Sequence, residues 1–290
     1  MRLSSLIPLL LITSVAGAQD TRTVFTGQIE SGAWLRIRGH KGNIRVEEAS
    51  GSTATVTART RYRRDSDAEV TYEVKRDGRN VTVCSITPRT RRCDESGYES
   101  RWGRDDRGEG SADFTVSLPR GVRLLASTGN GEVDIRNAGS DVRAASGNGE
   151  ININGAGGTV DVSTGNGEIL VDRAEGEVEA STGNGTIRVR TSRGPVSAST
   201  GNGSIDVEMA TLRGDEDMKF TTGNGSITVG FPSTLSARID ADGPFRNFET
   251  DFPLEMGRGF SSDRIRGTIG SGSRNIRLTT GNGRIRLRKI

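Results

Sequence analysis

Few residues of the types that perform catalysis occur in this chain, and their spacing favours structural roles. The 290-residue sequence contains one histidine, His40, so metal sites built from several histidines are excluded. Any catalytic triad with a histidine base would have to use His40. We therefore predict no catalytic, cofactor-binding or metal-binding residues.

The two cysteines, Cys84 and Cys93, lie nine residues apart, with Pro88 and several arginines between them. A lone pair at this spacing, without other nearby ligands, is a poor metal site, and no general base adjoins either thiol. In an oxidising compartment the expected outcome is a disulfide. We predict that Cys84 and Cys93 are bonded and pin a loop.

The most regular acidic pattern is a column of glutamates at an 18-residue spacing with an aspartate close by: Glu132, Glu150 and Glu168, with Asp134. Stacked strands would hold these glutamates about 4.8 Å apart, near the roughly 5–5.5 Å between the carboxyl groups of retaining glycosidases. A repeat produces such columns automatically, and Thr186 and Ser204 interrupt this one. A weak cation site on the glutamates is the other alternative, although the chain lacks the Gly/Asp nonapeptide of calcium-binding rolls.

Composition and charge exclude several other classes of protein. The 40 glycines recur at fixed intervals beside β-branched residues, without a collagen register and without the polar tracts of a disordered chain. The 40 basic and 37 acidic side chains are nearly balanced, and the arginines are spread among acids. We therefore expect no nucleic-acid partner.

The N-terminal residues have the pattern of a cleavable export signal. Arg2 precedes an apolar run from Leu6 to Val15, and Ala16-Gly17-Ala18 is a small-x-small cleavage site. We predict a signal peptide over residues 1–18 and an exported protein, periplasmic or extracellular. No cysteine follows the cleavage site for a lipid anchor, and no later segment is apolar enough to span a membrane.

A repeated Gly-Asn-Gly triplet dominates the rest of the chain. Its asparagines are 18 residues apart in the first five copies, and two further copies follow: Asn130, Asn148, Asn166, Asn184, Asn202, Asn224 and Asn282. Apolar residues stand five and three positions before each triplet and two and four positions after it, with mostly polar residues between them. This alternation with a period of two predicts two short strands in each unit, each with one buried face.

These units predict an all-β fold, a parallel β-solenoid of about 18-residue two-strand coils. A unit this small cannot bury its apolar face alone, so successive units must stack. The nine-residue half period favours a flattened coil over the three-sided hexapeptide helix, and the crossover rule favours a right-handed one. We predict the repeat solenoid over residues 123–290 and a β-rich region with divergent coils over residues 19–122.

The triplet has a mechanical explanation at the corner of each coil. Glycine and asparagine tolerate positive φ at a sharp turn, and stacked asparagines can form a hydrogen-bonded ladder. A second column directly precedes the triplet and has the parity of the buried positions: Thr128, Ser146, Thr164, Thr182, Thr200, Thr222 and Thr280. We interpret it as a hydroxyl ladder that closes the corner, because an ice-binding surface would need outward-facing threonines.

Two segments depart from the repeat, and the chain ends in a charged unit. Residues 87–110 are predicted to be an exposed loop pinned by the disulfide, with Tyr98 and Trp102 as alternative ligand-binding residues. Residues 240–264 are expected to pack on the flank of the solenoid or to form an extended hairpin. The final GRIRLRKI places arginines around Ile285 and Leu287, as expected of an edge that discourages further stacking.

Several stretches together resemble a bacterial family, the putative adhesins of domain of unknown function 4097. They are SLPRGVRLLASTGNGEVDI (Ser117 to Ile135), the reiterated STGNGxIxV, NFETDFPL (Asn247 to Leu254) and the closing GTIGSG and IRLTTGNGRIRLRK. The resemblance is strong from about Phe114 onward and weaker before it. It implies an exported envelope or surface protein and brings no catalytic residues with it.

Three functions follow as hypotheses. The first is a non-catalytic structural or adhesion-like envelope protein that binds a glycan, lipid or protein through its long faces. The second is an envelope-stress sensor or regulatory binding module. The third, which the residues support least, is a carbohydrate-active enzyme that uses the glutamate column.

Overall fold

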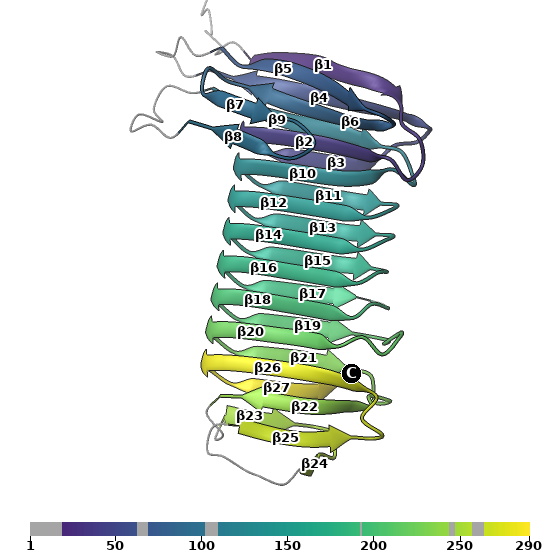
Figure 1. Cartoon of the computed structure of the whole chain (residues 1–290), viewed down its shortest axis with the longest axis vertical. Helices are drawn as coiled ribbons and strands as arrows, with labels where there is room; N and C mark the ends of the chain where they lie inside the picture. Colours follow the sequence, from purple (N-terminus) through teal and green to yellow (C-terminus); the bar gives the residue numbers. More distant parts are fainter. Residues whose placement is uncertain (1–18, 63–68, 102–109, 192, 244–246, 257–263) are drawn as a thin grey trace, which may run out of the picture.

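The protein is built from β-strands stacked into a long, flattened solenoid (Figure 1). The computed structural model describes residues 19–62, 69–101, 110–191, 193–243, 247–256 and 264–290, so the predicted signal peptide lies outside the described residues. No helix occurs in these ranges. Two large sheets of 12 and 13 strands form the two faces, and a separate two-stranded sheet lies beside them.

The body of the solenoid consists of two-strand coils that run through both sheets. Its strands are β10 (Arg123–Asn130), β11 (Val133–Ala138), β12 (Val142–Asn148), β13 (Ile151–Ala156), β14 (Val160–Asn166), β15 (Ile169–Ala174), β16 (Val178–Asn184), β17 (Ile187–Thr191), β18 (Val196–Asn202), β19 (Ile205–Met209), β20 (Met218–Asn224) and β21 (Ile227–Phe231). Even-numbered strands share the 13-stranded sheet, sheet B, and odd-numbered strands share the 12-stranded sheet, sheet A. Each strand pairs in parallel with its equivalent in the next coil, which confirms the predicted solenoid.

The core lies between the two sheets and consists of columns of like side chains. Ile151 pairs directly with Ile169, and Ile169 with Ile187, and all three are fully buried. Each such aliphatic side chain contributes roughly 1.5–3 kcal/mol of gross burial free energy. A shift of one residue in the strand register would expose all of them, so the period-two pattern determines which face of each strand is buried.

The corner after each sheet B strand requires glycine because successive coils approach closely there. A Cβ on Gly147 would lie 2.3 Å from the carbonyl oxygen of Gly129, and one on Gly149 would lie 2.0 Å from that of Gly131. The third residue of the triplet has positive φ, 155° at Gly149, but the asparagines do not. Close backbone stacking is therefore the main reason for the two glycines, and tolerance of positive φ applies only to the second of them.

The N-terminal region contributes coils of its own and a covering layer. Strands β2 (Trp34–Lys41) and β3 (Ile44–Glu48) form a coil stacked on β10 and β11, and β6 (Asn80–Ile86) and β9 (Ser111–Leu118) stack outside it. Strands β1 (Gln19–Gln28), β4 (Thr53–Arg61) and β5 (Thr71–Asp77) then add antiparallel neighbours. These antiparallel strands close the N-terminal end of the solenoid.

Residues 87–110 are inserted between β6 and β9, at the corner where the other coils have their short turn. The prediction of a loop is wrong for part of this segment, because β7 (Thr90–Cys93) and β8 (Tyr98–Ser100) form an antiparallel hairpin. The hairpin lies beside β2 in Figure 1. Residues 102–109, including Trp102, lie outside the described residues.

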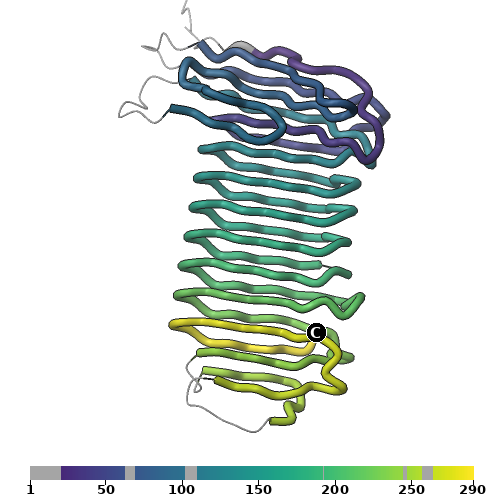
Figure 2. The backbone as a smooth tube through the Cα atoms, viewed as in Figure 1, coloured from purple at the N-terminus to yellow at the C-terminus, as the bar shows by residue number. Residues whose placement is uncertain are grey.

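The last coil of the chain does not form the end of the stack. Strands β26 (Arg274–Asn282) and β27 (Ile285–Lys289) pair with β20 and β21 on one side. On the other side they pair with the earlier strands β22 (Ala237–Asp242) and β23 (Phe248–Thr250), so the charged final unit is not an edge. Figure 2 shows this C-terminal coil in yellow between the coils that precede it in sequence.

The described residues of the 237–269 stretch therefore cover the C-terminal end of the solenoid. Of the two expectations for residues 240–264, packing on the flank is wrong, whereas the antiparallel pairing of β22 with β25 agrees with an extended hairpin. Strand β25 (Arg264–Ile269) pairs antiparallel with β22, and the two-residue β24 (Glu255–Met256) is the outermost strand of sheet B. An outer strand this short offers few free backbone groups for edge-to-edge association. Among the described residues, no helix is long and apolar enough to cross a membrane.

Candidate functional site

The asparagines of the repeat form a continuous ladder along one edge of the solenoid. Six hydrogen bonds of 2.8–2.9 Å join the seven asparagines. In each, Nδ2 of one asparagine donates to Oδ1 of the asparagine in the preceding coil, from Asn148, which donates to Asn130, through to Asn282. All seven side chains are exposed. Each amide keeps hydrogen-bonding capacity beyond its ladder bonds, so the edge presents a regular row of donors and acceptors to solvent.

The threonine column beside the triplet is buried and bonds to backbone. Each hydroxyl donates to the carbonyl of a glycine in the neighbouring coil, as Thr164 Oγ1 does to Gly149 at 3.0 Å and Thr222 Oγ1 does to Gly203 at 2.8 Å. The hydroxyls therefore close the corner as expected, but through these carbonyls rather than through one another. The column does not face solvent.

A second row of small side chains lies on the outer face of sheet B, two positions before the first glycine of each triplet. Strand pairing places its members side by side across the coils: Ser127, Ala145, Ser163, Ser181, Ser199, Thr221 and Thr279. We call this row and the asparagine ladder together the polar strip. The strip contains no charged side chain and extends for about 29 Å at ~4.8 Å per strand.

The carboxylates of sheet A are largely held by arginines. Glu168 forms an ion pair with Arg188, and Asp134 lies 3.5 Å from Arg45 and 3.1 Å from Arg136. Of the glutamate column predicted from the sequence, Glu168 is the member that an arginine holds, next to the similarly engaged Asp134.

Four aspartates, Asp94, Asp113, Asp217 and Asp240, have a lowered pKa, and two of them, Asp113 and Asp240, accept hydrogen bonds from arginine side chains. Burial disfavours the charged form of Asp113, but hydrogen bonds from Arg61, Arg59 and the Asn43 N–H outweigh it and hold the pKa of that carboxyl below its usual range. Hydrogen bonding from Arg264 likewise lowers the pKa of Asp240. Both groups are fixed anions, whereas a general acid would need a raised pKa.

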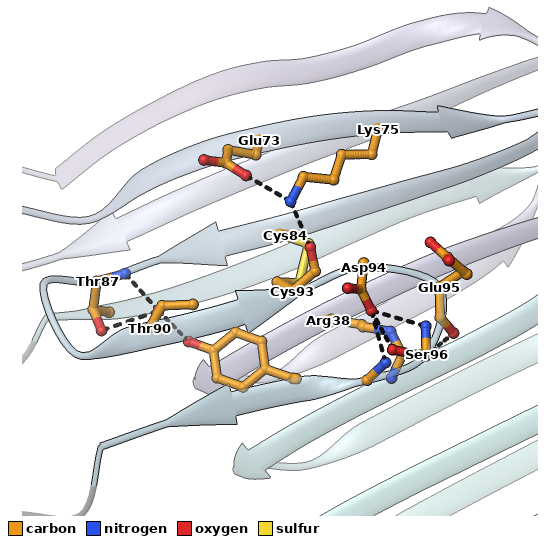
Figure 3. The surroundings of a disulfide bond; sticks show 12 residues. Arg38, Glu73, Lys75, Cys84, Thr87, Thr90, Cys93, Asp94, Glu95 and Ser96 are labelled. Carbon is orange, nitrogen blue, oxygen red and sulfur yellow. Dashed lines mark hydrogen bonds and ion pairs between the residues drawn. A yellow bond between two sulfur atoms is a disulfide. The ribbon is translucent and has the colours of Figure 1, made fainter.

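The structure joins Cys84 and Cys93 in a disulfide with their Cα atoms 6.2 Å apart (Figure 3). Both residues are buried, and the bond ties the β7–β8 hairpin to β6. Lys75 donates to the Cys93 carbonyl at 2.7 Å, and the Tyr98 and Thr90 hydroxyls lie 2.8 Å apart. The hairpin is therefore a fixed part of the molecule, held at several points.

A cavity of about 450 Å³ lies between the hairpin and the N-terminal end of the polar strip. It is lined by Arg38 and His40 of β2, Tyr98 of β8 and Ser127 of β10, and the rings of His40 and Tyr98 stack with their centroids 6.3 Å apart. Sequence reasoning missed Arg38. The signal was present, because aligning residues 34–48 with the repeat puts this arginine in the column that otherwise holds small residues.

No group of three or more histidine, cysteine, aspartate or glutamate side chains in the described part of the chain is arranged to hold a metal ion. Two candidate binding sites in the described residues are the polar strip and the cavity at its end. Both are suited to hydrogen bonding with a ligand.

The chain is similar to one protein family and, more distantly, to several solved structures. Solved structures that match include a putative adhesin from Bacteroides fragilis (12% identity, TM-score 0.40, covering 95% of this chain and 98% of the other) and one from Parabacteroides merdae (11%, 0.43, 94% and 97%). A putative cell adhesion protein from Clostridium sporogenes also matches, at 10% identity and a TM-score of 0.27, with 94% of this chain and 99% of the other covered. No curated protein matches the sequence. The model of the family Toastrack DUF4097 matches residues 33–288, and the chain belongs to this family of β-solenoids.

Proposed function

We propose that the protein is an exported, non-catalytic scaffold of the cell envelope that binds an extended ligand through its polar strip. The observation that carries this proposal is the strip itself, an uncharged row of hydroxyl and amide groups in register over seven coils. The proposed ligand is a glycan or another polymer with a regular repeat.

The physical basis is the summation of weak contacts. Each coil offers an asparagine amide, and every coil except that of Ala145 also offers a hydroxyl, at an interval of ~4.8 Å. A single exposed hydrogen bond contributes little net free energy, because water competes for both partners. Several such contacts made by one ligand act together, since each contact raises the effective concentration for the next.

The absence of catalysis is also part of the proposal. Its support is that Glu168 and Asp134 are engaged by arginines, and that the lowered pKa values of Asp113 and Asp240 favour their charged form, whereas a general acid would need a raised pKa. Location in the envelope is supported by the leader-like residues 1–18 and by the disulfide, a bond typical of oxidising compartments.

Matched double variants can test whether the strip binds. Ser163 and Ser181 are paired neighbours on the outer face of sheet B, and Asn152 and Leu170 are paired neighbours on the outer face of sheet A. Ser163→Arg with Ser181→Arg would obstruct the strip, whereas Asn152→Arg with Leu170→Arg adds the same charge to the opposite face. Binding would be measured by co-sedimentation with purified envelope polysaccharides and on a glycan array.

We expect the serine double variant to lose binding and the control pair to retain it, with no polysaccharide cleaved by any form of the protein. Equal binding by both variants would contradict the assignment of the strip. Cleavage that is abolished by Glu132→Gln, Glu150→Gln and Glu168→Gln together would contradict the non-catalytic proposal. One stoichiometric protein partner, without polymer binding, would favour the sensor or regulatory alternative.

A further inference from the structure

Arg38 is buried beneath the disulfide-bonded hairpin, and no described residue forms an ion pair with it. Arg38 is only 8% exposed, although it lies on the outward side of β2, because the turn of the hairpin covers it (Figure 3). Its Nη2 donates to the Glu95 carbonyl at 2.9 Å. Among the described residues, no carboxylate lies within ion-pair distance of its guanidinium.

Two hydrogen-bond donors at this place are also unused. Arg38 Nε and the Ser127 hydroxyl are buried and have no hydrogen-bond partner among the described residues. Ser127 is paired directly with Arg38 across β10 and β2, and both residues line the 450 Å³ cavity. Glu99 also lines the cavity, and its carboxylate is ion-paired with Arg92. Donors left unsatisfied at the wall of a cavity indicate that an acceptor is missing.

The nearby charges do not neutralise Arg38. The pKa of its guanidinium is lowered, first by burial and then by the positive charges of Arg36 and Arg92. The negative charges of Asp94 and Glu95 act in the opposite direction but do not outweigh these effects. The Asp94 carboxylate is occupied by its own turn, where Oδ1 accepts from Ser96 N at 2.9 Å and from Gly97 N at 3.2 Å. A desolvated cation without a counter-ion is costly, and an anion that enters the cavity would remove that cost.

We propose that this cavity binds an oxyanion, a carboxylate, sulfate or phosphate group, through Arg38 and the Ser127 hydroxyl. The planar guanidinium matches the geometry of such groups, and the hydroxyl supplies a further donor. The stacked rings of His40 and Tyr98 form a wall of the site. The site stands at the end of the polar strip, but it requires nothing of the strip and would bind a small anion by itself.

The experiment uses the full chain with its disulfide intact and inorganic phosphate, sulfate and acetate as probes at constant ionic strength. Calorimetry gives the affinity and stoichiometry, and ¹H–¹⁵N spectra of the arginine Nε–H groups report the contact. Arg38→Met removes the charge, and Ser127→Val removes only the hydroxyl. Arg190→Met is the matched control, since it removes an exposed arginine from sheet A.

We expect one anion per chain, a shift of the Arg38 Nε–H signal, and binding weakened about 10- to 100-fold in Arg38→Met. Ser127→Val should weaken binding less, and Arg190→Met should leave it unchanged. Tighter binding of acetate would identify a carboxylate as the preferred group, and tighter binding of sulfate or phosphate would identify a tetrahedral anion. The proposal is overturned if none of the three probes saturates the wild type, or if Arg38→Met and Ser127→Val both bind as tightly as the wild type.

Discussion

At each glycine of the repeat, the distance to the backbone of the neighbouring coil decides whether a side chain can be accommodated. At Gly149 a side chain would meet backbone, 2.0 Å from the Gly131 carbonyl oxygen, whereas at Gly51 a Cβ would find nothing within 4 Å. The sequence pattern revealed that glycine is required at the first of these positions. It did not reveal the reason, because a close approach between backbones 18 residues apart leaves no other trace in the sequence.

Gly149→Ala should therefore destabilise the protein by about 3 kcal/mol, since neither backbone can move without disturbing the coils on both sides. Gly51→Ala should change the free energy of unfolding by less than about 0.5 kcal/mol. Chemical denaturation of the two variants and the wild type measures this difference. A similar loss in both variants would show that stacking distance is not what requires the glycine.

Asp113 and Asp240 make stability depend on pH. Both have pKa values below the usual 3.8 in the folded protein. A carboxyl with a depressed pKa stabilises the fold fully above its unfolded pKa and loses that contribution as the pH falls toward its folded pKa.

The free energy of unfolding should therefore be insensitive to these groups near pH 7 and fall below about pH 4. Asp113→Asn should be less stable than the wild type at pH 7 and show a shallower acid dependence. Asp172→Asn, a change at an exposed position, should keep the slope of the wild type. Urea unfolding between pH 7 and pH 3 measures both slopes, and parallel slopes for Asp113→Asn and the wild type would rule out this role of Asp113.

Among the elements, the β7–β8 hairpin is the one that departs from the coil pattern and covers a candidate binding site. It replaces the short corner of an N-terminal coil, is bonded through Cys93 to Cys84, and covers Arg38. Residues 87–110 show no period-two pattern with a core face, so sequence reasoning assigned a loop. In the structure the bond between Thr90 and Tyr98 links the two strands of the hairpin, and the disulfide ties β7 to β6.

Replacing both cysteines by alanine should loosen this hairpin and leave the solenoid intact. A disulfide that closes a loop this short contributes about 2–3 kcal/mol, and here the contribution is confined to the hairpin. Hydrogen exchange should become faster for residues 90–100 and stay unchanged for the central coils, and the oxyanion site should weaken. Uniformly faster exchange through β12 to β19 would show instead that the bond supports the whole fold.

At the scale of the whole molecule, the order of coils in space differs from their order in the sequence at both ends. Strands β6 and β9 stack outside β2 and β3, and strands β26 and β27 lie between the coil of β20 and β21 and the strands β22 and β23. The 18-residue period predicts the central coils because each contacts its neighbour in sequence. The ends could not be predicted, since the return of Ile276 to Met218 crosses 58 residues, and other aliphatic pairs would satisfy the same pattern.

A scaffold that binds by repetition should have an affinity that depends on the length of its ligand. The most direct measurement is the dissociation constant of the purified protein for a ladder of oligomers of a polysaccharide that it binds, with the products analysed for cleavage. We predict that affinity rises with each added unit until the oligomer spans the polar strip, about 29 Å at ~4.8 Å per coil, and that every oligomer is recovered intact. Affinity that is independent of length, or shortened oligomers that accumulate with time, would contradict a non-catalytic scaffold that binds through its repeated coils.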